Sequence, residues 1–149
     1  MQFSDLTTLA PGHALARGVW RHLAGLNAVA VPEFTPARGL RCDLTALTSD
    51  GEIWIVECKS SLADFRADSK WHHYLEYCDR FFWAVDESFP QDILPADAGL
   101  IIADAHDAAI LRAAPLDKLP AARRKAQTLK LARAAARRLH AALDPGALA

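Results

Sequence analysis

Three charged side chains fall at positions where the flanking residues predict β-strands. Asp43 lies in the apolar run 40–47, and Glu57 and Lys59 close the next run, 52–59. Because residues i and i+2 of a strand point to the same face, Glu57 and Lys59 should project together. Two carboxylates can hold a divalent cation, and an adjacent ammonium can orient or help to deprotonate a water. These are the needs of metal-assisted phosphodiester hydrolysis.

The alternative interpretation is an exposed hairpin that carries ordinary surface ion pairs of little energetic value. The neighbours of the three residues argue against it, because Ile55 and Val56 precede Glu57 and Leu44 follows Asp43. Charges set within apolar strands are costly to bury unless they are paired or bind a metal. The residues therefore favour a metal centre.

The turn between the two runs decides whether these side chains can meet. Ser49-Asp50-Gly51 is a strong hairpin signal. A three-residue loop with Gly51 in the left-handed conformation pairs Thr48 with Glu52 and places Asp43 directly opposite Glu57. A two-residue Asp50-Gly51 loop would instead place Cys58 opposite Asp43 and turn Glu57 to the other face.

The length of 149 residues predicts a single domain over residues 1–149 with one sheet and two or three helices. The second run has apolar residues on both faces, so the sheet should be covered on both sides. Pro32 places the strand that contains it at a sheet edge. The expected helices span 6–25, interrupted near Pro11-Gly12, 61–78, broken near Asp68, and about 120–143; the expected strands span 28–34, 40–47, 52–59, 80–85, 99–103 and 109–113.

Several stretches resemble one group of nucleases. They are Arg41-Cys42-Asp43-Leu44, Glu57-Cys58-Lys59-Ser60, residues 64–71, Tyr77-Cys78-Asp79 and residues 122–126. Together they resemble the PD-(D/E)XK, or restriction-endonuclease-like, superfamily and, over residues 33–140, its MmcB-like DNA repair family. The short carboxylate and lysine signature is common by chance, whereas the run through Trp71 and Tyr77-Cys78-Asp79 is more specific.

The resemblance implies an α/β fold with an αβββαβ core: a mixed sheet flanked by helices, here with an added basic C-terminal helix. It implies that Asp43 and Glu57 ligate Mg²⁺ or Mn²⁺, with the backbone carbonyl of Cys58 as a further ligand. Lys59 would orient the attacking water and offset charge on the phosphate. Glu33, near the end of the preceding strand, is either another acidic ligand or a solvent-facing strand end.

The charge distribution points to a polyanionic partner, which the resemblance implies is DNA. Residues 1–111 carry a net charge of −8, whereas residues 112–140 carry nine basic residues and one acidic residue. On a helical wheel Leu129, Ala132, Ala136, Leu139 and Leu143 cluster, and most basic residues lie opposite. The basic half is either the solvated face of a docked helix or a phosphate-contacting face. The candidate DNA-binding residues are Lys70, Arg123, Arg124, Lys130, Arg133, Arg137 and Arg138.

The remaining features concern compartment and role. No apolar run approaches the ~18 residues of a membrane span, and no secretory signal is apparent, so we expect a cytoplasmic protein without a membrane partner. The three cysteines should be reduced, mostly buried thiols. We expect a DNA repair protein that acts as a Mg²⁺-dependent deoxyribonuclease, a hydrolase of phosphodiester bonds. The alternatives are a non-cleaving DNA-binding module and a module that docks other repair proteins, and the oligomeric state stays open.

Overall fold

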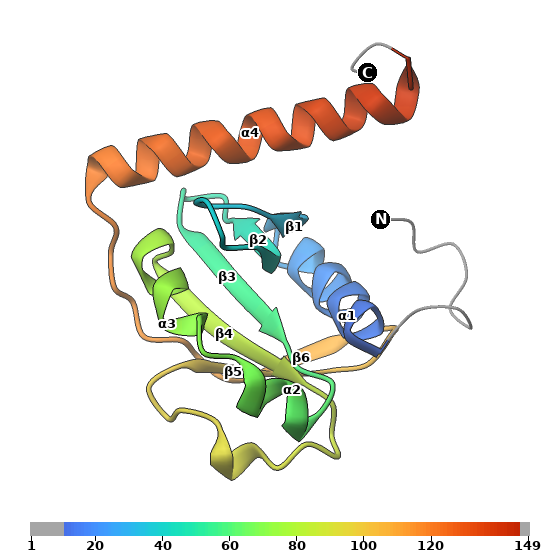
Figure 1. Cartoon of the computed structure of the whole chain (residues 1–149), viewed down its shortest axis with the longest axis vertical. Helices are drawn as coiled ribbons and strands as arrows, with labels where there is room; N and C mark the ends of the chain where they lie inside the picture. The colour runs from blue at the N-terminus through green and yellow to red at the C-terminus, as the bar shows by residue number, and fades with distance from the viewer. Residues whose placement is uncertain (1–10, 147–149) are drawn as a thin grey trace.

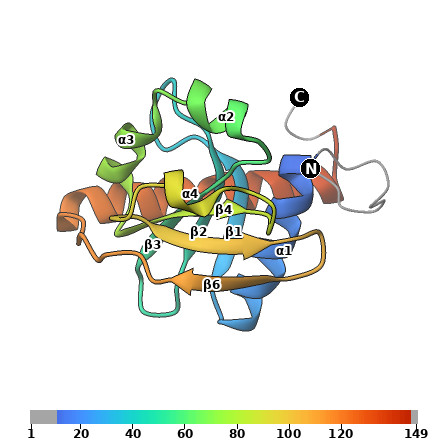
Figure 2. The same ribbon diagram turned by 90° about the horizontal axis from the view of Figure 1, so that it is seen from below.

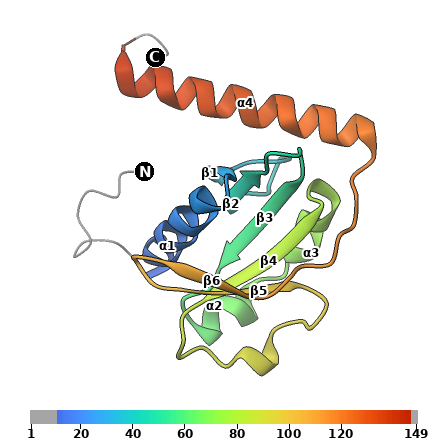
Figure 3. The same ribbon diagram turned by 180° about the vertical axis from the view of Figure 1, so that it is seen from behind.

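The computed structural model describes residues 11–146, which form a six-stranded mixed sheet covered on both faces (Figure 1). The helix α1 (Pro11–Gly25) covers one face, and the short helices α2 (Leu62–Ala67) and α3 (Trp71–Tyr74) lie on the other (Figure 2). The long helix α4 (Ala121–Leu143) crosses the molecule on the side of the first strands (Figures 1 and 3).

The strands are arranged in the sheet in their sequence order. They are β1 (Val29–Phe34), β2 (Cys42–Leu47), β3 (Ile53–Cys58), β4 (Arg80–Val85), β5 (Gly99–Ala103) and β6 (Ala108–Arg112). β3, β4 and β5 are parallel and the other pairs are antiparallel. The parallel step from β3 to β4 needs a crossover, which α2, α3 and a 3₁₀ turn (Leu75–Tyr77) supply. A second 3₁₀ turn (Gln91–Ile93) lies between β4 and β5.

Alternation along the strands builds two separate hydrophobic cores. Val56 and Phe82 pack on the α1 side, whereas Ile55, Trp83 and Tyr74 pack on the α3 side. The expected sheet with two covered faces is therefore confirmed, and the partly buried Trp71 packs against the same core as Tyr74. The three cysteines are free and buried, as predicted.

Most expected elements are present, with small shifts. The helix over 61–78 is broken at Asp68, which is the C-cap of α2 and accepts hydrogen bonds from the N–H groups at the start of α3. β1 is an edge strand, as Pro32 indicated. Pro120 is the N-cap of α4 rather than its first helical residue. The part of the first helix predicted before Pro11 lies outside the described residues. No helix within residues 11–146 has the length and apolar character that a membrane crossing requires.

The β2–β3 hairpin has the three-residue loop. The Thr48 N–H donates to the Glu52 carbonyl at 3.0 Å, and Gly51 has a φ of +92°, the left-handed conformation that glycine adopts at no steric cost. Leu44 pairs with Val56 and Leu47 with Ile53. The register ends at this first pair, and Asp43 and Glu57 are the next residues beyond it on the two strands.

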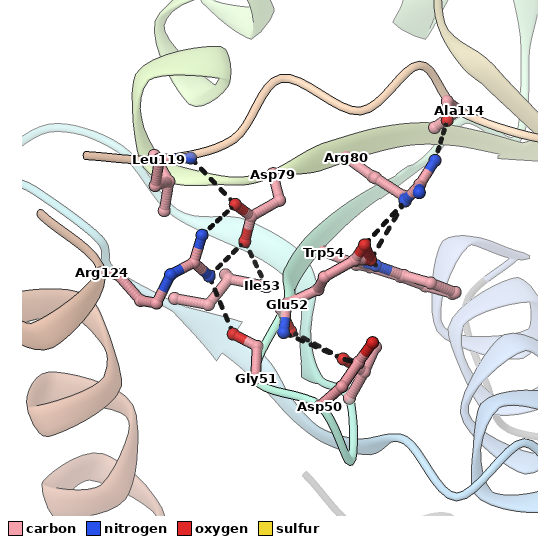
Figure 4. Close-up of polar contacts among 11 residues, drawn as sticks. Asp50, Gly51, Glu52, Ile53, Trp54, Asp79, Arg80, Ala114, Leu119 and Arg124 are labelled. Atoms are coloured by element: carbon pink, nitrogen blue, oxygen red, sulfur yellow. Dashed lines mark hydrogen bonds and ion pairs between the residues drawn. The ribbon is translucent and has the colours of Figure 1, made fainter. Parts of the chain in front are cut away.

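A buried carboxylate, Asp79, connects four segments of the chain (Figure 4). Its side chain is fully buried and accepts from the N–H groups of Ile53 and Leu119 at 2.7 and 2.9 Å. It also accepts two bonds from the Arg124 guanidinium, at 2.5 and 2.7 Å, and Arg124 donates to the Gly51 carbonyl at 2.8 Å. Burial opposes ionisation, but the Arg124 bonds and the two backbone donors hold the pKa of Asp79 below its ordinary value.

The side of α4 that docks is the one that carries arginines. Gln127 and Leu131 are its buried residues, and Leu131 packs on Val31 and Phe34. Arg124 is held by Asp79, and Arg138 donates to the carbonyls of Pro32 and Glu33. The expectation of a uniformly outward-facing basic half is thus wrong for Arg124 and Arg138. The buried carboxylate of Asp79 and the backbone carbonyls of β1 bind Arg124 and Arg138. The face of α4 that packs on the body is therefore not the one that hydrophobic periodicity alone indicates.

Removal of the Asp79 charge should cost stability in a pH-dependent way. Asp79→Asn leaves Arg124 without its counter-ion, and we expect the free energy of unfolding at pH 7 to fall by about 3–5 kcal/mol in urea unfolding. Because the folded-state pKa is depressed, the contribution is present above the unfolded pKa of about 4 and is lost as pH falls through the folded pKa. Exposed Asp92→Asn is the control. An equal loss at pH 7 and at pH 3 would contradict the ionic role.

Candidate metal centre

Asp43 and Glu57 lie at neighbouring strand ends on the α3 side of the sheet. Each carboxylate is fixed by the backbone of the opposite strand: Glu57 Oε1 accepts from the Asp43 N–H at 3.0 Å, and Asp43 Oδ2 accepts from the Cys58 N–H at 2.8 Å. The second oxygen of each carboxylate has no hydrogen-bond partner in the described part of the chain. Two free carboxylate oxygens, one from each strand, fit a divalent cation that prefers oxygen ligands.

Without a bound cation, burial and mutual repulsion make ionisation of this carboxylate pair unfavourable. Glu57 is 4% exposed. Its burial, followed by the nearby Asp43 carboxylate, raises its pKa to about 8, against an ordinary value of 4.5. Burial also raises the pKa of Asp43, although the Cys58 N–H and Lys59 oppose this shift. A bound cation would offset both burial and repulsion, which favours the metal interpretation of these residues.

Lys59 shares the face of Glu57, as the spacing predicted, and its ammonium is held by Asp68. Nζ lies 2.9 Å from Asp68 Oδ2, and both side chains are largely buried. Burial lowers the pKa of Lys59, but the bond to Asp68 and the nearby carboxylates outweigh it and keep the pKa above its ordinary value. Lys59 is therefore an ammonium in this state, suited to orienting a water and to neutralising charge rather than to accepting a proton.

Asp68 has two roles in the structure. Asp68 Oδ1 accepts from the N–H groups of Lys70 and Trp71 and so satisfies donors at the start of α3, while Oδ2 binds Lys59. The position of the lysine thus depends on the junction between α2 and α3. The ion pair had no signal in the sequence because its members are nine positions apart and a helix lies between them.

Cys58 can contribute only its backbone to a metal. Its thiol is buried among the α1-side residues, on the face opposite to the carboxylates. Burial, with Asp43 and Glu57 adding to it, raises the thiol pKa well above its ordinary value and disfavours the thiolate that binds metals. This arrangement is compatible with the expected carbonyl ligand.

Glu33 has a different environment from the carboxylate pair. Its φ of +50° is in the left-handed region, and its Oε1 lies 3.6 Å from His13 Nε2. It is still close enough to contribute to the raised pKa of Asp43. Within residues 11–146, no three His, Cys, Asp or Glu side chains are placed to hold a metal together. A Mg²⁺ site needs no third carboxylate, because water and substrate phosphate can complete its shell.

The candidate DNA-binding residues divide into two groups. Arg124 and Arg138 are held by the protein as described above, Lys130 donates to the Pro36 carbonyl at 3.1 Å, and Arg123 stacks on Tyr77 at 4.7 Å. Arg133, Arg137 and Lys70 are exposed, and their side chains have no ion-pair or hydrogen-bond partner among the described residues. The three exposed residues are the ones available to a phosphate.

Comparison with known proteins places the chain in a family. A family model described as DNA repair protein MmcB-like matches residues 6–146, and the protein belongs to this MmcB-like DNA repair protein family. A solved structure of a protein of unknown function from Silicibacter pomeroyi is 58% identical in sequence. It matches with a TM-score of 0.93 over 95% of this chain and 97% of that one. No curated protein matches the chain.

The raised pKa of Glu57 should make the metal-free protein less stable as pH rises. Between about pH 4.5 and pH 8 the folded state keeps a proton that the unfolded state releases, so the free energy of unfolding falls over this range. Glu57→Gln removes this ionisation. In urea unfolding with EDTA, we expect the variant to gain on the order of 2 kcal/mol over wild type at pH 8.5 and almost nothing at pH 4.

The control for this comparison is Glu87→Gln, which removes an exposed carboxylate. It should shift neither curve. A difference between Glu57→Gln and wild type that is the same at both pH values would mean that Glu57 ionises as an ordinary carboxylate.

Proposed function

We propose that this protein is a Mg²⁺-dependent nuclease that hydrolyses DNA phosphodiester bonds, with Mn²⁺ as an alternative ion. The observation that carries the proposal is the Asp43–Glu57 pair, with one free oxygen on each carboxylate and the Lys59 ammonium on the same face. Membership of a DNA repair family supports DNA as the substrate. The order of α1, three strands, crossover helices and β4 agrees with a restriction-endonuclease-like αβββαβ core.

Each residue of the centre has a distinct task in this proposal. Asp43 and Glu57 would hold Mg²⁺, and the backbone carbonyl of Cys58 would be a further ligand. Glu33 is a weaker candidate for an additional ligand. When bound, the ion would supply Lewis-acid activation of a water and of the scissile phosphate. Lys59 would position that water and counter the charge that develops on the phosphate oxygens. Asp68 would keep the lysine in place.

A basic groove beside the centre supports a path for the DNA backbone. It is a cavity of about 350 Å³ between the end of β1 and α4, lined by Glu33, Phe34, Thr35, Lys130, Arg133, Ala134, Arg137 and Arg138. Glu33 borders this groove and lies on β1 between Pro32 and Phe34, whose partners Leu44 and Cys42 flank Asp43, so groove and centre are neighbours. Four cations and one carboxylate line it, which favours a polyanion.

The second candidate function is a DNA-binding or partner-docking module on the same fold that does not cleave. One observation favours it: in the described part of the chain only two acidic side chains converge, and no third joins them. Binding through the exposed arginines would not need the centre, because phosphate contacts fix a protein on DNA without chemistry.

Two substitutions separate catalyst from binder. Glu57→Gln should weaken Mg²⁺ binding measured by titration calorimetry, whereas Lys59→Ala should leave it intact or slightly tighter, because a nearby positive charge is lost. Both should abolish Mg²⁺-dependent cleavage while much DNA affinity survives. The assay uses single-stranded, duplex and branched DNA, with Mg²⁺ or Mn²⁺ against EDTA, and Glu87→Gln as the control. Cleavage that persists in Lys59→Ala would count against this centre.

The exposed arginines should set the salt dependence of DNA binding. Arg133→Gln with Arg137→Gln removes two phosphate contacts, so the log–log slope of duplex affinity against salt should flatten by about two units. Affinity is measured by fluorescence anisotropy at several salt concentrations. Arg21→Gln, on the exposed side of α1, should leave the slope unchanged. An unaltered slope in the double variant would assign this face to another role.

A further inference from the structure

The apolar side of α4 points to solvent. Leu129, Ala132, Ala136, Leu139 and Leu143, named here the leucine stripe, are all exposed. The leucines are 60%, 61% and 78% exposed, whereas Leu131, on the docked side, is 4% exposed. Leaving such a row of leucines in water forgoes the free energy that burial would give, and contiguous apolar surface of this kind marks interaction sites.

The spacing of the leucine stripe specifies the shape of what covers it. Its members follow one another at intervals of three, four, three and four residues, the a/d repeat of a coiled-coil seam. Such a narrow seam accepts the side chains of one facing α-helix, whereas a helix that lies on a membrane presents a broader apolar face with bulky aromatic residues. The stripe contains no aromatic residue.

A groove continues the stripe toward the start of α4. It is a cavity of about 590 Å³ between the segment that precedes the helix and the helix itself, and Leu119, Thr128, Leu129 and Ala132 line it with Lys118 and Lys125. Leu129 and Ala132 belong to both the groove and the stripe. A concave apolar pocket at one end of a helical seam fits a large apolar side chain of a partner helix.

The charge around the surface selects the partner. α4 carries seven basic residues and no acidic one. Lys118 and Lys125 line the groove and have no acidic partner among the described residues. The α4 of a second copy would bring seven more positive charges and no negative one to the seam. Residues beside a coiled-coil seam choose their partner by opposite charge.

We propose that the leucine stripe and its groove bind an acidic amphipathic helix of a protein partner. The partner presents leucine-like residues at three- and four-residue intervals and inserts one of them into the groove. Its flanking Glu or Asp residues pair with Lys118 and Lys125. The surface is on the side of α4 away from the buried Leu131, so its occupation does not depend on the candidate metal centre.

The test uses a synthetic helix of about three heptads with Leu at the seam and Glu beside it. Its binding to the full chain is followed by fluorescence anisotropy. Two comparison peptides carry Lys in place of Glu, or the same residues with the seam scrambled. We expect binding of the acidic peptide and at least about tenfold weaker binding of both others. Equal binding of the acidic and Lys peptides, or of the scrambled one, would overturn the proposal.

Variants of the protein locate the surface. Leu129→Gln with Leu139→Gln should weaken binding of the acidic peptide at least about tenfold, because central apolar contacts dominate such interfaces. Lys125→Glu should shift preference toward the Lys peptide. Ala141→Gln, an exposed substitution outside the stripe, is the control and should change neither. Since these positions are exposed, urea unfolding should show unchanged stability, and Mg²⁺-dependent cleavage should be unaffected. Equal peptide binding by the double Gln variant would refute the site.

The other occupants of the stripe are tested with the same double variant. Self-association in sedimentation velocity that is lost in Leu129→Gln with Leu139→Gln would overturn the proposal in favour of a second copy. Co-sedimentation with phosphatidylglycerol vesicles that is lost in the same variant would overturn it in favour of a membrane surface. We expect neither.

Discussion

The ion pair between Asp79 and Arg124 is the interaction on which the arrangement of the molecule depends. Asp79 is at the start of β4, and its carboxylate binds the first amide of β3, the segment before α4, and α4 itself. Arg124 also binds the carbonyl of Gly51 in the β2–β3 turn. A buried carboxylate is costly to leave unpaired. Moving any one of these segments away from Asp79 would remove at least one of its four hydrogen-bond donors and so destabilise the fold.

This connection determines which way α4 faces. With Arg124 fixed at one end and Arg138 bound to the carbonyls of β1 toward the other, the helix cannot rotate about its axis. Arg133 and Arg137 then line the groove beside Glu33, and the leucine stripe faces away from the body. One helix therefore presents a cationic side near the carboxylates and an apolar side to solvent, and both proposed binding surfaces follow from the same docking contacts.

The candidate centre depends on a second constraint, the register of the β2–β3 hairpin. A left-handed glycine at position 51 allows the three-residue loop, and this loop brings Asp43 and Glu57 to adjacent positions just beyond the Leu44–Val56 pair. A slip of one residue would have turned Glu57 to the opposite face. The backbone amides of Asp43 and Cys58 then fix one oxygen of each carboxylate, so the pair is oriented before any ion is present.

The sequence alone determined the local features of this protein. Alternation, turn residues and prolines predicted the strands and helices, because side-chain burial in strands follows a period of two. The turn residues located the hairpin but left its two- and three-residue loops open, and the Thr48–Glu52 hydrogen bond decided between them. The same spacing put Glu57 and Lys59 on one face. These inferences succeed because each rests on residues within a few positions of one another.

The tertiary structure decided what depends on distant partners. Asp68 binds Lys59 across a helix. The Glu33 carboxylate lies beside His13 and does not join Asp43 and Glu57 as a third acidic side chain. The docked face of α4 was set by Asp79 and by backbone carbonyls of β1, although the helical wheel marked the leucines as its apolar side. Hydrophobic periodicity shows that a helix has an apolar face, but partners elsewhere in the chain determine whether that face is buried. An arginine whose guanidinium is hydrogen-bonded to the body of the protein can hold a helix in place as a buried leucine does.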